Sequence, residues 1–451
     1  MRSIKDKAKE IFALMTTSEM YLNYAKYNAW YTGNTRALRA AAGHGSFWGS
    51  SAKQKMHVPI AAELAEQSGN LLFGQPPNVY SFAASSQGRL EYILEQSDFF
   101  ENLYAGAERA AALGDMYIKI NWDTELLDCP IVSFVPAECA YAEYVQGIAV
   151  GYHFFTVKEE NGEKLTWVYE YYTRGSVTTK LYTGTKASIE KKIYESTVET
   201  GIDAVLAVHI PNILPNKESC GNFGQSDIAD VIPLMDALDE TYSSWLRDMR
   251  LAKARLIVPM EYMRLKPSVL DSGSQKVFHF DKEDDLYVAM DIDSSQVHSP
   301  ITLSQFTIRS NEHKLLANEL LERIISCAGY SPQTFGLEIR GTAQSGTALS
   351  IRERKTFVTK SKKELCFKGR LQKFLGLVLA ADNVIFGKSH LSTKVSVEIK
   401  GRDGYLGGIA ETVNLLNSAG AVSTYTKVQV LHPDWDDATI REEVLKIQTE
   451  G

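Results

Sequence analysis

The residues best suited to chemistry in this chain are four neighbouring carboxylates, Asp284, Asp285, Asp291 and Asp293. Paired carboxylates are the groups that general acid–base catalysis uses. They lie between short apolar runs in an acidic, turn-rich stretch, which favours a solvated or partner-facing surface. An enzyme that uses this cluster is the alternative hypothesis.

Two further patterns carry less chemistry than their spacing suggests. The run Gly69-Asn-Leu-Leu-Phe-Gly74 has the glycine spacing of a phosphate loop, but Gln75 and Pro76 replace the required lysine and Ser/Thr. It therefore predicts a helix that ends at glycine. His432 lies beside three aspartates, and we interpret this group as a helix start in an acidic loop rather than a metal site. We expect no metal, no cofactor and no enzymatic activity.

A segment rich in helix-breaking residues runs from Ser331 to Leu349 between two helical stretches. Such breakers deny regular structure, and the hydroxyl side chains among them are short. Because no catalytic residues accompany it, the segment is typical of a part that touches another molecule without transforming it. The breakers are Pro332, Gly336, Gly341 and Gly346, and the hydroxyl residues include Ser331, Thr334, Thr342 and Ser345.

Positive charge is concentrated between Arg352 and Lys373, where nine basic residues accompany two acidic ones. One interpretation is an exposed helical face that makes ion pairs between subunits. The other is contact with nucleic-acid phosphates, although the charges do not follow one face at a strict helical step. Both interpretations concern Arg352, Arg354, Lys355, Lys360, Lys362 and Lys363.

The composition is that of a folded protein: 451 residues, 44% of them hydrophobic, can bury the cores of two or more subdomains. No window approaches the roughly 18 to 20 uninterrupted apolar residues of a membrane helix. The charged start resembles a helix rather than a signal peptide, so we expect a protein kept in a cytosol or in a particle assembled there. The net charge of −7 disfavours a protein that grips DNA, but not one that lets DNA slide past.

The cysteines give no sign of a disulfide framework or a zinc cluster, because they are odd in number, widely spaced and without a C-x-x-C pair. We expect all of them to be reduced and buried. They are Cys129, Cys139, Cys220, Cys327 and Cys366.

Hydrophobic periodicity predicts an α+β protein. The first 115 or so residues read mostly as helix, with a mobile loop at Gly43–Ser51, and Asn161-Gly162 predicts a hairpin later in the chain. Helices are expected after His57 and at about 89–113, strands at 116–122, 131–135, 148–157, 165–173, 177–182 and 205–213, and a lysine-rich helical segment near 186–196.

The second half of the chain predicts two long helices, at 226–256 and about 303–327, around short strands. Pro233 predicts a short first turn or a kink in the first of them. We expect the two helices to pack antiparallel, with the strands at one tip. A long helix to about Ile385, a strand at 391–400 and a helical pair at 409–417 and 436–448 complete the prediction.

The order of these parts resembles a tailed-bacteriophage portal protein, of the group found in long-tailed phages. No single motif is diagnostic, but the similar stretches are collinear and cover most of the chain. They are V-P-I-A-A-E-L-A-E-Q-S-G-N-L-L-F-G-Q-P-P at 58–77, A-A-L-G-D-M-Y-I-K-I-N-W-D at 111–123, D-A-L-D-E-T-Y-S-S-W-L-R-D-M-R-L-A-K-A-R-L at 236–256, S-P-Q-T-F-G at 331–336, S-G-T-A-L-S-I-R-E-R-K at 345–355 and H-P-D-W-D-D at 432–437.

The resemblance implies an α+β portal fold that assembles as a ring, usually a dodecamer, at one capsid vertex. It implies an α/β wing at 1–225, stem helices at 226–256 and 303–330, a small α/β clip at 257–302, a tunnel loop at 331–345, a long bridging helix with a return strand of the wing at 346–400, and a helical crown at 401–451.

The function implied is a non-enzymatic channel through which double-stranded DNA passes, without sequence preference, during packaging and ejection. The protein would reside in the virion after assembly in the host cytoplasm. Its partners would be terminase, which would hydrolyse ATP, then a head–tail adaptor, with major capsid and scaffolding proteins around the ring and no membrane. The DNA-channel residues would be Glu338, Arg340, Thr342, Gln344 and Ser345, and the clip residues that bind partners would be Lys282, Glu283, Asp284, Asp285, Asp291 and Asp293.

This assignment agrees with the physics of the loop. A strand that a motor moves must not stick, so short hydroxyl and amide side chains suit the surface that faces it. A tight cationic groove would lose affinity steeply with salt and would resist sliding. A portal-like component of a prophage or gene-transfer particle would obey the same physics and remains an alternative.

Overall fold

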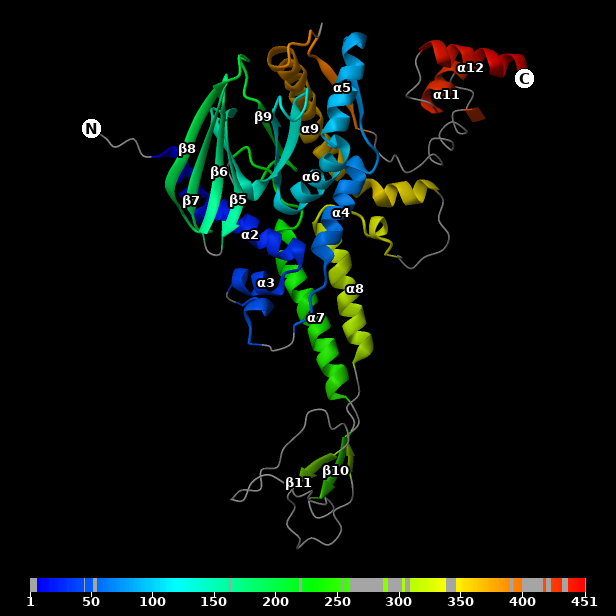
Figure 1. Ribbon diagram of the computed structural model, residues 1–451. Coiled ribbons are helices and arrows are strands. Elements are labelled where there is room, and N and C mark those ends of the chain that lie inside the picture. The colour runs from blue at the N-terminus through cyan, green and yellow to red at the C-terminus, as the bar shows by residue number, and fades with distance from the viewer. Residues whose placement is uncertain are drawn as a thin grey trace.

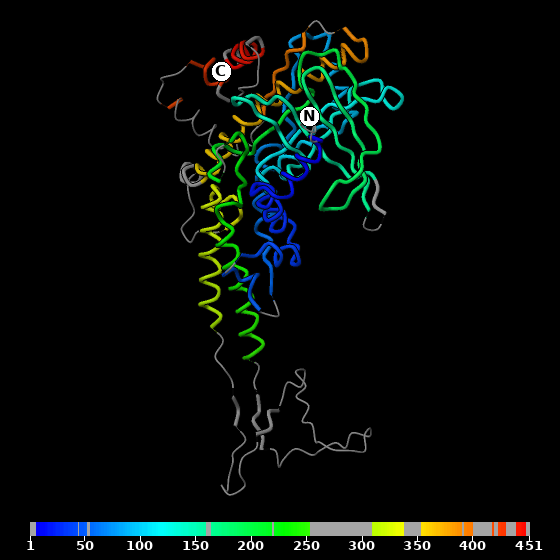
Figure 2. The backbone as a smooth tube through the Cα atoms, turned by 90° about the vertical axis from the view of Figure 1, so that its left-hand side faces the viewer, coloured from blue at the N-terminus to red at the C-terminus, as the bar shows by residue number. Residues whose placement is uncertain are grey.

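The computed structural model shows an elongated protein, in which two long helices extend from a body of helices and sheets (Figures 1 and 2). The structure describes residues 6–43, 45–51, 55–161, 164–218, 221–252, 255–259, 287–290, 302–304, 309–337, 346–389, 392–399, 417–418, 423–431 and 437–450.

The N-terminal part is mainly helical, as the sequence predicts. Asn34 caps one of these helices, because its side-chain oxygen accepts hydrogen bonds from the backbone N–H groups of Arg36 and Ala37. The elements are α1 (Lys7–Thr17), α2 (Glu19–Thr32), α3 (Thr35–Ala41), the 3₁₀ turn η1 (Phe47–Gly49), α4 (Ile60–Phe73), α5 (Ala84–Gln96) and α6 (Phe99–Leu113).

The single helix predicted at about 89–113 is wrong, because the structure divides this stretch into α5 and α6. Asp98, between them, has a φ of 43°, a left-handed conformation that no residue adopts within an α-helix. Ser97, before it, accepts a hydrogen bond at its Oγ from the N–H of Val132. The chain therefore turns at the point where hydrophobic periodicity alone continues.

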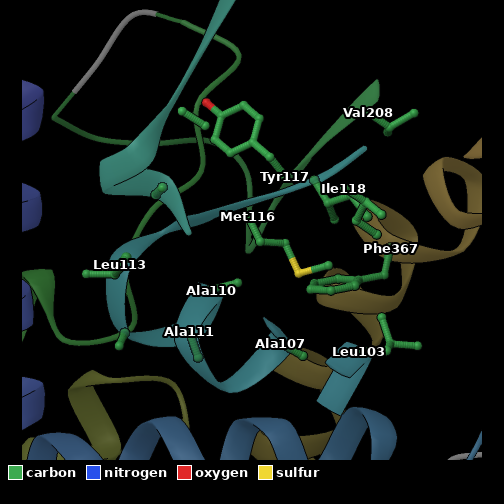
Figure 3. Packing of buried hydrophobic residues seen from close by; sticks show 14 of the residues in the cluster. Leu103, Ala107, Ala110, Ala111, Leu113, Met116, Tyr117, Ile118, Val208 and Phe367 are labelled. Carbon is green, nitrogen blue, oxygen red and sulfur yellow. The ribbon is translucent and has the colours of Figure 1, made fainter. Parts of the chain in front are cut away.

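Close packing of α4 on α6 explains the glycine spacing in the first of these helices. A Cβ on Gly69 would lie 3.3 Å from the Cβ of Glu108, so a larger residue there would require Glu108 to move by a few tenths of an ångström. The prediction of a helix that ends at Gly74 is confirmed, since α4 ends at Phe73. Figure 3 shows the adjoining core, which gathers Leu103, Ala107, Ala110, Ala111, Leu113, Met116, Tyr117, Ile118, Val208 and Phe367.

Two antiparallel sheets form the middle of the chain, with strand orders β3-β2-β9 and β4-β5-β6-β7-β8. The predicted hairpin is confirmed by the pairing of Asn161 with Lys164. The strands are β2 (Asp115–Asn121), β3 (Ile131–Pro136), β4 (Ala140–Val145), β5 (Ile148–Asn161), β6 (Lys164–Thr173), β7 (Ser176–Gly184), β8 (Ile189–Glu199) and β9 (Ala207–Pro211), and the 3₁₀ turn η2 (Ala137–Cys139) joins β3 to β4.

The helical segment predicted near 186–196 is wrong, because this stretch is strand β8. It lies at the edge of the five-stranded sheet, where it pairs with β7. Thr178 and Thr197 share a hydrogen bond across this pair, and Lys180 lies 3.0 Å from Glu195. Lysines are common on edge strands because they discourage pairing with a further chain. Here the ladder to β7 overrides the local pattern.

The two helices that extend from the body are α7 (Ile232–Leu251) and α8 (Ser310–Cys327), and they lie side by side (Figures 1 and 2). A 3₁₀ turn, η3 (Ala229–Val231), precedes α7, in agreement with the short turn predicted before Pro233. The predicted start of the second helix near 303 is wrong. There the short strand β12 (Thr302–Ser304) pairs with β10 (Arg255–Pro259), which also pairs with β11 (Tyr287–Met290).

The helix predicted to reach Ile385 is confirmed as α9 (Gly346–Ile385), the longest described element. A strand follows it, β13 (Val395–Glu398), which pairs with β1 (Asn78–Ser81), a strand absent from the prediction. The other elements are η5 (Pro332–Phe335), α11 (Thr424–Leu431) and α12 (Asp437–Glu450).

The cysteine prediction is correct for Cys129 and Cys366, which are free thiols and buried. Cys139 is half-buried, and Cys327 at the end of α8 is exposed, which corrects the expectation for this residue. Cys220 lies outside the described residues.

His153 supplies a pH-dependent contribution to stability. It is fully buried in the five-stranded sheet, its Nδ1 lies 2.8 Å from the Tyr169 hydroxyl, and its ring stacks on that of Tyr171. Burial, and to a lesser extent the nearby Lys7, lower the pKa of His153 to about 4 against the opposing effect of Glu143.

Because the pKa of His153 is lower in the folded state than the value of 6.5 expected when unfolded, the unfolded chain binds the proton first. The stability that this residue contributes is complete above pH 6.5 and is lost between pH 6.5 and about 4. From pH 7 to 5 the parent should lose about 2 kcal/mol more than His153→Gln in urea unfolding. Equal losses in both proteins would contradict this.

Candidate functional site

The predicted DNA-channel and clip residues lie outside the described ranges. The candidate site is therefore defined by the described residues on either side of the predicted loop. The DNA-channel residues are Glu338, Arg340, Thr342, Gln344 and Ser345, and the clip residues are Lys282, Glu283, Asp284, Asp285, Asp291 and Asp293. Both flanks of the loop are described, up to Leu337 on one side and from Gly346 on the other.

The first flank leaves α8 through a sharp turn. Gly329 has a φ of 97°, and a Cβ there would lie 2.8 Å from Thr359 Oγ1, so both conformation and space require glycine. Tyr330 is 1% exposed and Ser331 is 3% exposed. The 3₁₀ turn η5 follows and ends at Gly336, which has a φ of 71°.

Polar side chains of α9 hold this flank in place. The N–H of Ser331 donates to Thr356 Oγ1 at 2.9 Å, and the hydroxyls of Thr334 and Thr356 lie 2.9 Å apart. Thr359 Oγ1 donates to the Gly329 carbonyl at 2.6 Å. Together these contacts fix the two flanks of the loop against each other.

One turn further along α9, Lys363 is buried and fully hydrogen-bonded. Its Nζ donates to Ser68 Oγ at 2.5 Å, to Asp227 Oδ2 at 2.5 Å and to the Tyr330 hydroxyl at 3.0 Å. The Tyr330 hydroxyl also donates to Asp227 Oδ2, at 2.6 Å. We call Ser68, Asp227, Tyr330 and Lys363 the lysine joint, because it ties α4, the segment before α7, the end of α8 and α9 together.

Burial governs ionisation in the lysine joint. It lowers the pKa of Lys363, and the adjacent Asp227 carboxylate opposes that change. Burial also raises the pKa of Tyr330 well above its ordinary value, and Asp227 adds to the increase. Tyr330 is therefore a permanent hydrogen-bond donor, and the attraction of Asp227 favours the ammonium form of Lys363.

The basic run is not one exposed face, which corrects the sequence interpretation. Lys363 is 1% exposed and Lys360 is 6% exposed, and Lys360 lies 3.4 Å from Glu364 on the same helix. Lys355 is exposed and donates to the backbone carbonyl and hydroxyl of Ser326. Arg352 lies in α9 as well.

Arg354 and Lys362 are exposed and flank an apolar groove on α9. Val358 in this groove is 47% exposed and Leu365 is 80% exposed. Phe357 and Ser361 complete its lining. The exposed part of the basic run is therefore a mixed surface, in which cationic and apolar side chains alternate.

A second set of buried contacts holds the loop expected to be mobile at Gly43–Ser51. Asp239 of α7 is fully buried and accepts three hydrogen bonds from this part of the chain. The donors are Trp48 Nε1 at 2.9 Å, His57 Nδ1 at 2.8 Å and the Val58 N–H at 2.8 Å. Asp236, about one turn earlier, accepts from the Phe47 N–H at 2.6 Å. We call residues 46–51 and 55–58 the strap; they are bonded to α7.

Within the described ranges, no group of three or more His, Cys, Asp or Glu residues is arranged to hold a metal ion. In the same part of the chain, no helix is both long and apolar enough to cross a membrane.

Comparison with known proteins assigns the class. Residues 17–451 match the model of a family of phage portal proteins. This family is described as phage portal protein, SPP1 Gp6-like, and the chain belongs to it. Members of such a family typically have a structural rather than an enzymatic role. A search of curated proteins found no match.

Among solved structures, the chain is similar to two necks of GTA particles. The neck of an empty particle, computed with C6 symmetry, is 11% identical with a TM-score of 0.44, over 83% of this chain and 90% of the other. The neck of a native particle, computed with C12 symmetry, is 10% identical with a TM-score of 0.44, over 94% and 98%.

The strap predicts a large effect at Asp239. Asp239→Ala leaves three buried donors without their acceptor, and we expect a loss of about 3 to 5 kcal/mol in the free energy of unfolding. Glu240→Ala removes an exposed carboxylate from the next position and should change stability by less than about 0.5 kcal/mol. Denaturation curves of the two variants that coincide would show that the strap contributes no stability.

Proposed function

We propose that this protein is the portal subunit of a phage-like particle, and that its copies form a ring through which double-stranded DNA passes during packaging and ejection. The observation that carries the proposal is the family match over residues 17–451. Its position would be one vertex of the capsid, where terminase and then a head–tail adaptor would dock. A prophage or gene-transfer particle would use the same ring.

Each proposed domain contains helices or strands that the structure describes. The wing (1–225) contains the two antiparallel sheets, and the stem (226–256 and 303–330) contains α7 and α8. The clip (257–302) contains β11 and the last three residues of β10, which begins at Arg255 in the range proposed for the stem. The tunnel loop (331–345), the bridging helix with its return strand (346–400) and the crown (401–451) follow in this order.

The surface of the helix pair supports assembly into a ring. Large apolar side chains on α7 and α8 are exposed in the single subunit, and a contact with a neighbouring copy would remove them from water. A head-to-tail contact between different faces of identical subunits closes into a ring when its rotation permits. The exposed residues are Leu246 37%, Met249 50%, Leu251 44%, Leu315 65% and Leu316 51%. We propose a dodecamer.

The loop supports a conduit rather than a clamp. Thr342, Gln344 and Ser345 would offer short polar contacts to passing DNA, and Glu338 and Arg340 would be the charged exceptions. The net charge of −7 agrees with weak contact, because strong binding to phosphates requires an excess of cations.

Deleting Gly341 to Gln344 should leave rings intact and impair DNA packaging, because the described flanks hold the subunit together without this segment. Electron microscopy of negatively stained rings and a packaging assay would measure the two properties. Alanine at Thr124 and Glu125, in an exposed turn before β3, is the control and should package normally. Normal packaging by the deletion variant would refute the role of the loop.

Charge reversal at Asp284 and Asp285 should weaken the binding of terminase and adaptor at least about tenfold without preventing ring closure, because like charges would replace complementary ones. Binding to immobilised rings would measure this. Reversal of the exposed Glu95 and Glu125 changes the net charge equally and is the control. If both double variants bind partners as the parent does, the clip assignment fails.

A further inference from the structure

The lysine joint brings together residues that are far apart in the sequence and adjacent to the tunnel loop. Lys363 lies on α9, Asp227 just before η3 and Tyr330 just after α8. All three side chains are buried, with exposures of 1%, 8% and 1%. Every donor of Lys363 can be used, because its ammonium group has three hydrogens and three oxygen partners.

A buried ion pair of this kind contributes more to uniqueness than to stability. The energy needed to strip water from two charges offsets most of their attraction, so apolar residues of similar size often give equal stability. An apolar pair, however, imposes no such restriction on how the helices pack. A buried charge does, because a shifted helix would leave it without its partner. The best-attested role of buried polar groups is to fix the register of packed helices.

The buried residues of α9 show which alternative register of this helix the lysine joint excludes. Phe367, Leu371 and Phe374 lie along the same helix at steps of three or four and are at most 1% exposed. If α9 slid by one turn, Phe367 would occupy the position of Lys363 and leave the Asp227 carboxylate unpaired. One-turn shifts of this size are a known mode of movement between packed helices, and the lysine joint opposes one here.

We propose that Lys363 is a positioning residue, which with Asp227 and Tyr330 fixes the register of α9 against the end of α8. This register sets how many residues lie between Thr334 on the first flank and the residue of α9 that it contacts, which is Thr356 in the native register. The proposal depends on the proposed function only in calling the chain between these two flanks the tunnel loop.

The hydroxyls of Thr334 and Thr356 allow register to be measured directly. Since they lie 2.9 Å apart, cysteines at these positions should form a disulfide in the native register. A second pair, Thr334→Cys with Lys360→Cys, is displaced by about one turn and reports the shifted register. Each pair would be made separately in a protein that also carries Cys327→Ser. Peptide mass analysis would then identify the disulfide that forms in each.

The variant to test is Lys363→Met with Asp227→Asn, which removes both charges with little change in volume and keeps an acceptor for the Asn212 amide at position 227. Lys363→Met alone leaves a buried carboxylate unpaired and is expected to unfold, so the double variant carries the test. Lys368→Met is the matched control, with the same substitution at an exposed lysine of the same helix.

In the double variant, the rate of disulfide formation between positions 334 and 356 should fall about tenfold, and the 334–360 disulfide should appear. The Lys368→Met control should behave as the parent does. Retention of the parental pattern by the double variant would overturn the proposal. A shifted register with normal DNA packaging would support the role of Lys363 and contradict the role proposed for the loop.

Discussion

The arrangement of α8, the loop and α9 depends on one constraint, the need of a buried ammonium group for acceptors. Lys363 is 1% exposed, and Asp227, Tyr330 and Ser68 satisfy it. Each of these three comes from a different part of the chain. Because the charge cannot be left unpaired in the interior, the parts must meet at one place. The apolar packing around them supplies stability but would accept several registers.

The strap shows the same principle at a second buried acid. Asp239 on α7 accepts hydrogen bonds from Trp48, His57 and Val58, which lie 181 to 191 residues earlier in the sequence. A buried carboxylate with several donors tolerates few alternative arrangements, since each lost hydrogen bond leaves a buried group unsatisfied. Two buried acids, Asp227 before α7 and Asp239 within it, thus hold α7 to the rest of the subunit.

The sequence predicts the elements whose periodicity reflects burial, and it fails where a local contact decides. Helices α7 and α9 are predicted because each has a long helical pattern, and the hairpin of β5 and β6 is predicted because Asn161-Gly162 is a turn signal. The turn at Asp98 and the strand β8 are missed because a left-handed residue and pairing with β7 override that pattern. The lysine joint had a signal in the sequence: Lys363 continues the stripe of Phe367, and a lysine in an apolar stripe implies a buried partner. The identity of that partner, Asp227, is fixed only by the fold.

The burial of Lys363 and Lys360 changes the balance between the two interpretations of the basic run. Binding of phosphates needs exposed cations and gains nothing from exposed leucine, because the DNA backbone offers charge rather than apolar surface. Leu365 is 80% exposed and Val358 is 47% exposed, and both line the same groove as the cationic Arg354 and Lys362. Exposed apolar side chains next to charged ones are the composition of a protein–protein contact. The exposed face of α9 therefore fits a neighbouring protein better than it fits nucleic acid.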